Sequence, residues 1–407
     1  MPSPLPKPTY FNRTTPPHIT TLVIISGIGA ITLNIFIAAL PEMAKHFGVS
    51  YAYMQLAITA YLFMSGIFQL IIGPISDRYG RRFVMLGCIT IFTLASIGAN
   101  YTSSFEAFIF FRVFQAVIVS GLVLARTIVR DMVAREDAAS MIGYVTMGMA
   151  LAPMLGPPLG GFLTEIYGWQ STLHFMTLSG IIVYMICWFD LGETNQHMSG
   201  SFAAQIKNYP ELIRSRRFWG YALTAAFAAA TFFAYLGGSP YVGSEIYGLS
   251  SAQIGGYMML TPLGYMIGNG ISGKFTKRLG IYRMIFVGIL ITLSGMAASL
   301  IAISIGFNHP LEFFLFTITI GLGNGLCLPS ANAGMLDIKP ELAGSASGLG
   351  GTLMTIGGVA FTMLANIALS TSSSPYPLVL CIMLASIVGL FAAFYTVRIE
   401  KQLGRFE

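Results

Sequence analysis

Twelve long apolar segments dominate this sequence. Each has about 20 residues, the length that a helix needs to cross about 30 Å of hydrocarbon. Only 9% of the residues are charged, whereas a soluble domain carries about 25% charge. Because the spans are apolar all round and do not alternate as barrel strands would, an all-α membrane protein is predicted, with spans near 19–40, 52–75, 83–99, 105–128, 138–163, 171–191, 218–238, 252–273, 283–303, 311–331, 344–368 and 377–397.

The basic residues indicate how these spans are oriented. When the N-terminus is placed in the cytoplasm and the spans alternate, all but two of the 22 Lys and Arg residues fall on the cytoplasmic side. The exceptions are Lys45, which falls outside, and Arg112, which lies well inside the fourth span. Cytoplasmic loops are enriched in Lys and Arg, so both termini are predicted to be cytoplasmic, and the bias supports the count of twelve.

The chain divides into two halves of six spans. The hydrophilic connection between them contains NYPELIRSRRFW, which is compatible with a short interfacial helix. The predicted parts are a cytoplasmic tail, a six-helix bundle, a cytoplasmic linker, a second six-helix bundle and a second tail, at 1–18, 19–191, 192–217, 218–397 and 398–407. Three residues recur at an offset of 200, namely Gly73, Arg78 and Gly80 as Gly273, Arg278 and Gly280. A parallel repeat of this kind is typical of transporters that bind substrate at the midplane between the halves.

The stretch GPISDRYGRR concentrates charge between spans two and three. We expect a short cytoplasmic turn in which Gly73 admits a neighbouring helix backbone and Asp77 sits at the positive N-terminal end of an adjoining helix. Its arginines would pair with carboxylates such as Asp131. The alternative is that these basic residues only hold the loop in the cytoplasm.

The same stretch resembles the loop motif of the major facilitator superfamily, G-x-L-x-D-R-x-G-R-R/K. FRVFQAVIVSG resembles the R-x-x-Q-G motif, APMLGPPLGG resembles the G-P-x-x-G-G motif associated with antiporters, and NIFIAALPEMAKHFGVS is similar to the D-M-Y-L-P-A-L-P start of Bcr/CflA drug:proton antiporters. The resemblance covers essentially the whole chain and implies a twelve-helix fold of two pseudo-symmetric six-helix bundles. Asn34 replaces the aspartate usual in that group, and Ala116 replaces the glycine after Gln115. Since Asn cannot bind and release a proton, Asn34 argues against proton coupling through span one.

Arg112 is the only cation deep in a span, where an unpaired charge costs at least about 2.5–3.5 kcal/mol. It could gate or couple transport, anchor an acidic substrate, or serve as a structural arginine bonded to helix carbonyls. The residues predicted to act in coupling are Arg112, Gln115, Glu106 and His174. No acid lies at the midplane, so a proton carrier would be Glu106, Asp77, Asp131 or His174, and coupling to another ion or simple facilitation stays open.

Span five combines helix-bending prolines with a small-residue face. Its sliding against a neighbour could close one side of a cavity, although a kink without a gating role is the alternative. GSASGLGGTLMTIGG in span eleven is its natural counterpart. The residues predicted to act in gating and conformational change are Gly73, Asp77, Arg78, Gly80, Arg81, Asp131, Gly156, Pro157, Gly160 and Gly161.

The cavity is expected to be lined by aromatic, Met and amide side chains. Aromatic and Met residues suit flat or lipophilic ligands, and an unpaired amide is costly in hydrocarbon. The candidate substrate-binding residues are Asn34, Tyr61, Tyr144, Met147, Phe232, Tyr235, Tyr257, Tyr265, Asn324 and Asn332.

The sequence favours a transporter over an enzyme. It has no G-x-x-x-x-G-K-[ST] phosphate loop, no metal-ligand spacing, and four cysteines that lie singly in apolar runs as packing residues. We expect no cofactor, metal or nucleic acid. The predicted function is export of small, partly lipophilic compounds in exchange for protons, by a monomer in a bacterial inner membrane. The alternative is a dedicated carrier of one metabolite, such as a siderophore, an amino-acid-like compound or a nucleoside.

Overall fold

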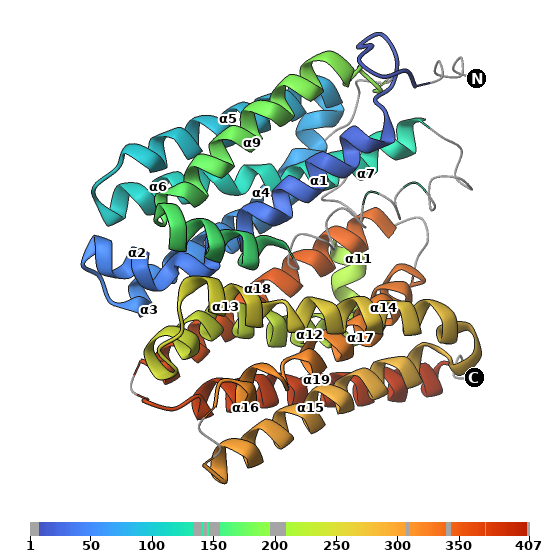
Figure 1. Cartoon of the computed structure of the whole chain (residues 1–407). Helices are drawn as coiled ribbons and strands as arrows, with labels where there is room; N and C mark the ends of the chain where they lie inside the picture. Colours follow the sequence, from blue (N-terminus) through green and yellow to red (C-terminus); the bar gives the residue numbers. More distant parts are fainter. Residues whose placement is uncertain are drawn as a thin grey trace. The chain divides into compact units, whose positions relative to one another are not determined.

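The computed structural model describes residues 8–132, 141, 145, 155–195, 209–306, 309–338, 343–370 and 372–404. Every regular element in these ranges is helical (Figure 1). Contacts between Cα atoms divide the chain into two compact units, Met1–Val49 with Leu56–Gln205, and Ser50–Gln55 with Ile206–Glu407. The predicted helical membrane fold is confirmed.

The first unit is built from long apolar helices interrupted by short 3-10 turns. Helix α9 packs against α5, α5 against α6, α4 against α6, and α1 against α7. The helices are α1 (Ile19–Asn34), α2 (Leu40–Phe47), α4 (Leu56–Tyr79), α5 (Arg81–Tyr101), α6 (Phe105–Gln115), α7 (Ser120–Met132), a helix over 155–167, and α9 (Gln170–Asp190).

The second unit is centred on α12, which packs against α17, α18 and α19. Its helices are the short α3 (Tyr51–Met54), α11 (Tyr209–Arg214), α12 (Arg216–Tyr241), α13 (Ser251–Met258), α14 (Leu260–Leu279), α15 (Ile281–Ser304), α16 (Leu311–Phe314), α17 (Ile318–Leu336), α18 (Ala343–Leu369) and α19 (Tyr376–Gln402). Helix α11 occupies part of the stretch for which a short helix was anticipated, and its Leu212 is buried in the core of this unit.

Ten helical segments in the described ranges are long and apolar enough to cross a membrane. The two further predicted spans are 138–163, most of which lies outside the described residues, and 252–273, which is helical as α13 and α14. The four cysteines are free and buried, as expected of packing residues.

The connection between α4 and α5 differs from the predicted turn. Helix α4 continues to Tyr79, so Gly80 is the one residue between the two helices, with φ +92° and ψ 149°. Gly280 joins α14 to α15 in the same way, with φ +81° and ψ 158°. This backbone region is essentially restricted to glycine, which explains why glycine recurs at these two equivalent points.

The expected close approach at Gly73 is not found, because a Cβ built there would meet no described atom within 4 Å. Backbone contact occurs instead between α14 and α17. There a Cβ on Gly268 would lie 3.0 Å from the Cα of Gly325, and one on Gly321 would overlap the carbonyl oxygen of Thr261. Small residues allow helices to approach this closely in membranes.

We predict that Gly80→Ala lowers the melting temperature more than Gly280→Ala does. Both substitutions force alanine into a backbone region that costs about 1–3 kcal/mol. A Cβ at Gly80 would also overlap the Glu193 carboxylate, whereas one at Gly280 meets nothing within 4 Å. Thermal denaturation of the purified variants in detergent tests this difference, and equal losses would contradict it.

Candidate functional site

The first candidate site surrounds Arg112, which is 0% exposed in α6. Its Nη1 donates to Gln115 Oε1 at 2.6 Å, and its Nε donates to the Ala57 carbonyl at 3.5 Å. The guanidinium carbon lies 4.0 Å from the Phe36 ring centroid and 4.6 Å from that of Tyr61. Aromatic faces attract cations, and more strongly where water is excluded.

Arg112 has no carboxylate partner among the described residues, and its Nη2 has no hydrogen-bond partner there. Gln115 is fixed in turn, because its Nε2 donates to Ser96 Oγ at 3.0 Å. Tyr61 is also buried, and its hydroxyl donates to the Gly29 carbonyl at 3.3 Å. The arrangement holds a positive charge between aromatic rings and leaves Nη2 of Arg112 without an acceptor among the described residues.

The structure does not bring Glu106 or His174 to Arg112. Glu106 is exposed in the first turn of α6, more than one helical turn from Arg112. On α9, Met176 faces Arg112, with its Sδ 4.0 Å from Nη1. Because two residues along a helix correspond to about 200° of rotation, His174 points to the other side, where it is exposed.

Asn34 lies at the end of α1 and is 2% exposed. Its Nδ2 donates to the Ala30 carbonyl at 2.7 Å, while its Oδ1 has no partner in the described part of the chain. A Cβ at Gly156 would lie 2.6 Å from the Asn34 Cβ, and one at Gly160 would overlap the Ile35 carbonyl oxygen. The helix over 155–167 therefore meets the end of α1 through the small-residue face expected of span five, which also includes the buried Gly161 and Pro157.

The second candidate site is an ionic cluster where α4, α5 and α7 end or begin. Arg81 is 6% exposed, its Nε donates to Asp131 Oδ2 at 3.1 Å, and its Nη1 pairs with Asp77. The expected pairing of an arginine in this stretch with Asp131 is thus present. Arg78 is exposed and lies over the Tyr79 ring.

The position expected for Asp77 is taken by Glu193. Its Oε1 accepts from the Arg81 backbone N–H at 2.9 Å, and its Oε2 accepts from that of Arg82 at 3.1 Å. These are free N–H groups at the start of α5, which attract a negative charge. Asp77 is in the last turn of α4 and is drawn to the Arg81 side chain instead. Glu193 follows α9 by three residues, so local spacing gave no signal of this contact.

Burial raises the pKa of the Asp131 carboxyl above its ordinary value, although attraction to Arg81 and hydrogen bonds from Arg81 and Thr194 act against it. Thr194 Oγ1 donates to Asp131 Oδ2 at 3.2 Å, and Asn195 Nδ2 donates to the Asp77 carbonyl at 2.8 Å. The segment after α9 therefore binds the carboxylate of Asp131 and the backbone of Asp77.

Two buried acids that sequence reasoning did not select tie the last long helix of each unit to the first. Asp190, at the end of α9, is 0% exposed. It accepts from the backbone N–H groups of Phe11 and His18, each at 2.9 Å, and from Thr21 Oγ1 at 2.7 Å. The described part of the predicted N-terminal tail is therefore bound to the end of α9.

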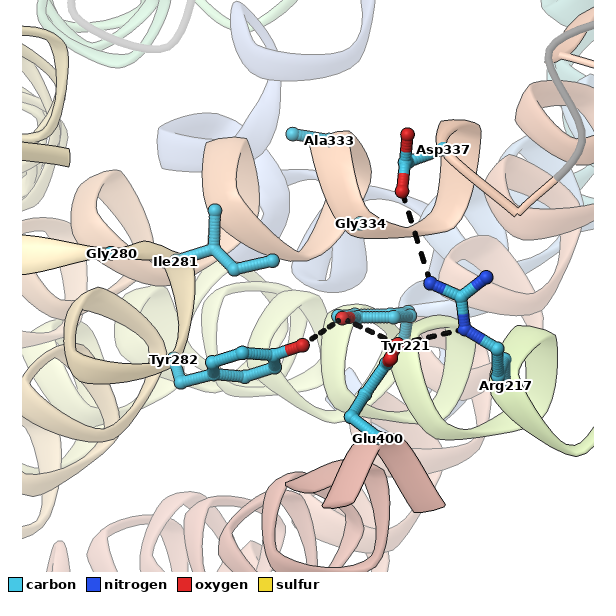
Figure 2. Close-up of a pocket in the computed structure, with 9 residues that line it drawn as sticks. All are labelled: Arg217, Tyr221, Gly280, Ile281, Tyr282, Ala333, Gly334, Asp337 and Glu400. Atoms are coloured by element: carbon cyan, nitrogen blue, oxygen red, sulfur yellow. Dashed lines mark hydrogen bonds and ion pairs between the residues drawn. The ribbon is translucent and has the colours of Figure 1, made fainter. Parts of the chain in front are cut away.

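In the second unit the residue that corresponds to Asp190 is Glu400, near the end of the last long helix α19 (Figure 2). It is 1% exposed and accepts from Arg217 Nε at 2.8 Å and from the Tyr221 hydroxyl at 3.0 Å. The Tyr282 hydroxyl lies 3.1 Å from that of Tyr221, and Asp337 is 3.8 Å from Arg217. These residues line a cavity of about 500 Å³.

The candidate substrate residues of the second unit are spread over several helices. Asn324 donates to Thr231 Oγ1 at 3.2 Å, Tyr257 stacks on Phe314 at 5.0 Å between ring centroids, and Tyr235 is 1% exposed. Phe232, Tyr265 and Asn332 are partly buried. Tyr144 and Met147 lie outside the described residues.

Comparison with known proteins finds a family profile, and sequence relatives and a solved structure that are named as transporters or resistance proteins. The profile of the Major Facilitator Superfamily matches residues 22–362. A bicyclomycin resistance protein homolog of Haemophilus influenzae is 24% identical over 87% of this chain and 90% of its own. Multidrug resistance protein D of Escherichia coli is 28% identical over 83% of this chain and 85% of its own. A bacterial homolog of the human lysosomal transporter Spinster, solved inward-facing, has the same fold, with a TM-score of 0.72 and 17% identity over 94% of this chain and 96% of its own.

We predict that Asp131→Asn changes how stability depends on pH. Well below about pH 4 the Asp131 carboxyl is protonated in both the folded and the unfolded chain. As the pH rises, the unfolded chain releases this proton first, because the folded-state pKa is the higher one, and the free energy of unfolding falls until the folded carboxyl has also ionised.

The melting temperature of the natural chain should therefore fall relative to that of Asp131→Asn between pH 4 and pH 7. Thermal denaturation of both proteins across this range in one buffer series measures the difference. If the melting temperature of the natural chain instead rises relative to that of Asp131→Asn as the pH rises, the prediction is contradicted.

Proposed function

Since the chain belongs to the Major Facilitator Superfamily, we propose that it exports small, partly lipophilic compounds, including antibiotics, in exchange for protons. The observation that carries the proposal is that relatives covering more than four fifths of the chain are named for resistance to bicyclomycin or to multiple drugs. The protein would act as a monomer in a bacterial inner membrane, with both termini in the cytoplasm. Its two six-helix halves, 19–191 and 218–397, would expose a substrate site to each face in turn.

The surroundings of Arg112 support a role in this transport. A buried charge without an ionic partner is expensive, and aromatic rings together with the Nη2 group, which has no partner among the described residues, suit a ligand that brings an apolar body and a hydrogen-bond acceptor. We propose that Arg112 recognises such an acceptor on the substrate, with Tyr61 and Asn34 nearby in the same unit.

Proton exchange would require a group that titrates during the cycle. Asn34 cannot provide one, and no described acid pairs with Arg112. Asp131 is one of the acids considered from the sequence, and burial raises the pKa of its carboxyl above the ordinary value. We propose that the cluster of Asp77, Arg81 and Asp131 responds to cytoplasmic pH, with Glu106 and His174 as the remaining candidates.

One observation favours a second function on the same fold, namely transport of a single metabolite. Asn34 stands where the Bcr/CflA group usually has an aspartate, so this chain could differ from the drug exporters in its cargo or in its coupling. A dedicated carrier would discriminate between compounds that a multidrug exporter accepts together.

We predict that expression of this protein in a bacterial host stripped of drug pumps raises the minimum inhibitory concentrations of several unrelated antimicrobials. Arg112→Ala should abolish this gain while the protein is still inserted, because the cation proposed to bind the substrate is lost and the span keeps its apolar length. Growth assays with immunoblots of the membranes provide the measurement. Protection against one compound or none would favour the dedicated carrier, and full activity of Arg112→Ala would remove Arg112 from the mechanism.

We predict that substrate uptake into inverted proteoliposomes follows an imposed pH gradient and stops when an ionophore collapses it. Asp131→Asn should weaken this dependence, whereas Glu165→Gln, on the described helix over 155–167 and away from the cluster, serves as the matched control. Uptake that continues unchanged without the gradient would exclude proton exchange as the driving force, without excluding transport itself.

A further inference from the structure

One face of α19 carries a continuous apolar stripe that ends in two cations. Successive members of the stripe are three or four residues apart, so they share one helix face. Five apolar residues, between 39% and 68% exposed, come first, and two exposed basic residues continue the spacing: Leu380, Leu384, Ile387, Phe391 and Phe394, then Arg398 and Lys401. Other faces of α19 pack into the second unit, where Ala385, Ala393 and Ile399 are buried.

The charged end of the stripe is hollowed. A cavity of about 490 Å³ opens there, and it is lined by Phe394, Val397, Arg398, Lys401 and Gln402. Its lining combines an aromatic ring, an aliphatic side chain, two cations and an amide. This is the combination that an amphiphilic ligand with a negative group requires.

The neighbouring helix α15 extends the same surface. The ring of Phe286 lies 4.8 Å from that of Phe394, centroid to centroid. Arg283, three residues earlier and so on the same side of α15, is exposed. The only acid of α19, Glu400, is 1% exposed and turned toward Arg217 (Figure 2). The charged residues that α15 and α19 expose on this surface, Arg283, Arg398 and Lys401, are therefore all basic.

We propose that the end of α19 binds the headgroup of an anionic phospholipid. In a membrane the exposed stripe is covered by acyl chains, because hydrocarbon is the medium around the spans. The long side chains of Arg398 and Lys401 reach from the apolar surface to the headgroup level, where basic residues at a membrane surface attract anionic lipids. Because the apolar stripe runs directly into the cations, the geometry fits a ligand that has both acyl chains and a phosphate, and a free anion would leave the stripe unused.

The site does not depend on which compound is transported or on proton exchange. The predicted orientation places it on the cytoplasmic side, where the second tail begins. It would hold lipid at the end of the last helix, beside the bonds of Glu400 to Arg217 and Tyr221.

Native mass spectrometry of the purified full-length protein tests the proposal. The protein in detergent is titrated with phosphatidylglycerol or with phosphatidylcholine of the same acyl chains. The natural chain should bind phosphatidylglycerol more tightly. Arg398→Gln/Lys401→Gln should weaken phosphatidylglycerol binding about 25-fold, at about fivefold for each cation removed, and leave phosphatidylcholine binding unchanged.

Lys274→Gln/Arg278→Gln is the matched control, because it removes two exposed cations from α14 without touching the stripe. It should bind phosphatidylglycerol as the natural chain does. The single variants Arg398→Gln and Lys401→Gln, each with an intermediate loss, replace the double variant if that variant does not fold. Unchanged phosphatidylglycerol binding in the α19 variants, an equal loss of both lipids, or an equal loss in the α14 control would each overturn the proposal.

Discussion

Hydrocarbon supplies no hydrogen-bond partner to a peptide group, and this constraint shapes the whole chain. Each span must satisfy its own backbone, so it is helical, and charged side chains are confined to helix ends or must be bonded where they are buried. The ionic cluster of Arg81 and the bonds of Asp190 and Glu400 follow this rule at the ends of helices. Arg112 is also bonded, but its partners are the Gln115 amide, the Ala57 carbonyl and aromatic rings, and no carboxylate among the described residues pairs with this fully buried charge.

The two units join their last long helix to their first through different chemical groups. In each unit a buried carboxylate bonds the last long helix to the first. Asp190 receives backbone N–H groups and Thr21, whereas Glu400 receives Arg217 and Tyr221. Thr21 and Tyr221 are 200 positions apart, the offset seen between Gly80 and Gly280. Equivalent positions in the two units therefore keep their place in the structure even where the residue type differs.

Sequence alone predicted the helical class and most helix positions, because apolar length determines them, and it predicted that an arginine of the Gly73–Arg82 stretch pairs with a carboxylate such as Asp131. It did not predict that Gly80 alone joins α4 to α5, since a polar stretch at a helix end looks the same whether it is helix or turn. It missed Glu193, Asp190 and Glu400, whose partners lie more than 100 residues away along the chain. The burial of Arg112 was foreseen, but its aromatic neighbours depend on how the chain just after α1 packs with α4 and α6.

The single-residue junctions have a consequence for how this chain can change in length. An α-helix turns by about 100° for each residue, so one residue inserted beside Gly80 would swing every side chain of α5 away from the neighbour it now meets. A substitution within α5 changes the contacts of one side chain, whereas an insertion before α5 rotates the entire helix. The one-residue connections at Gly80 and Gly280 therefore fix the rotation of the helices that follow them. Insertions and deletions during evolution should accumulate in other connections.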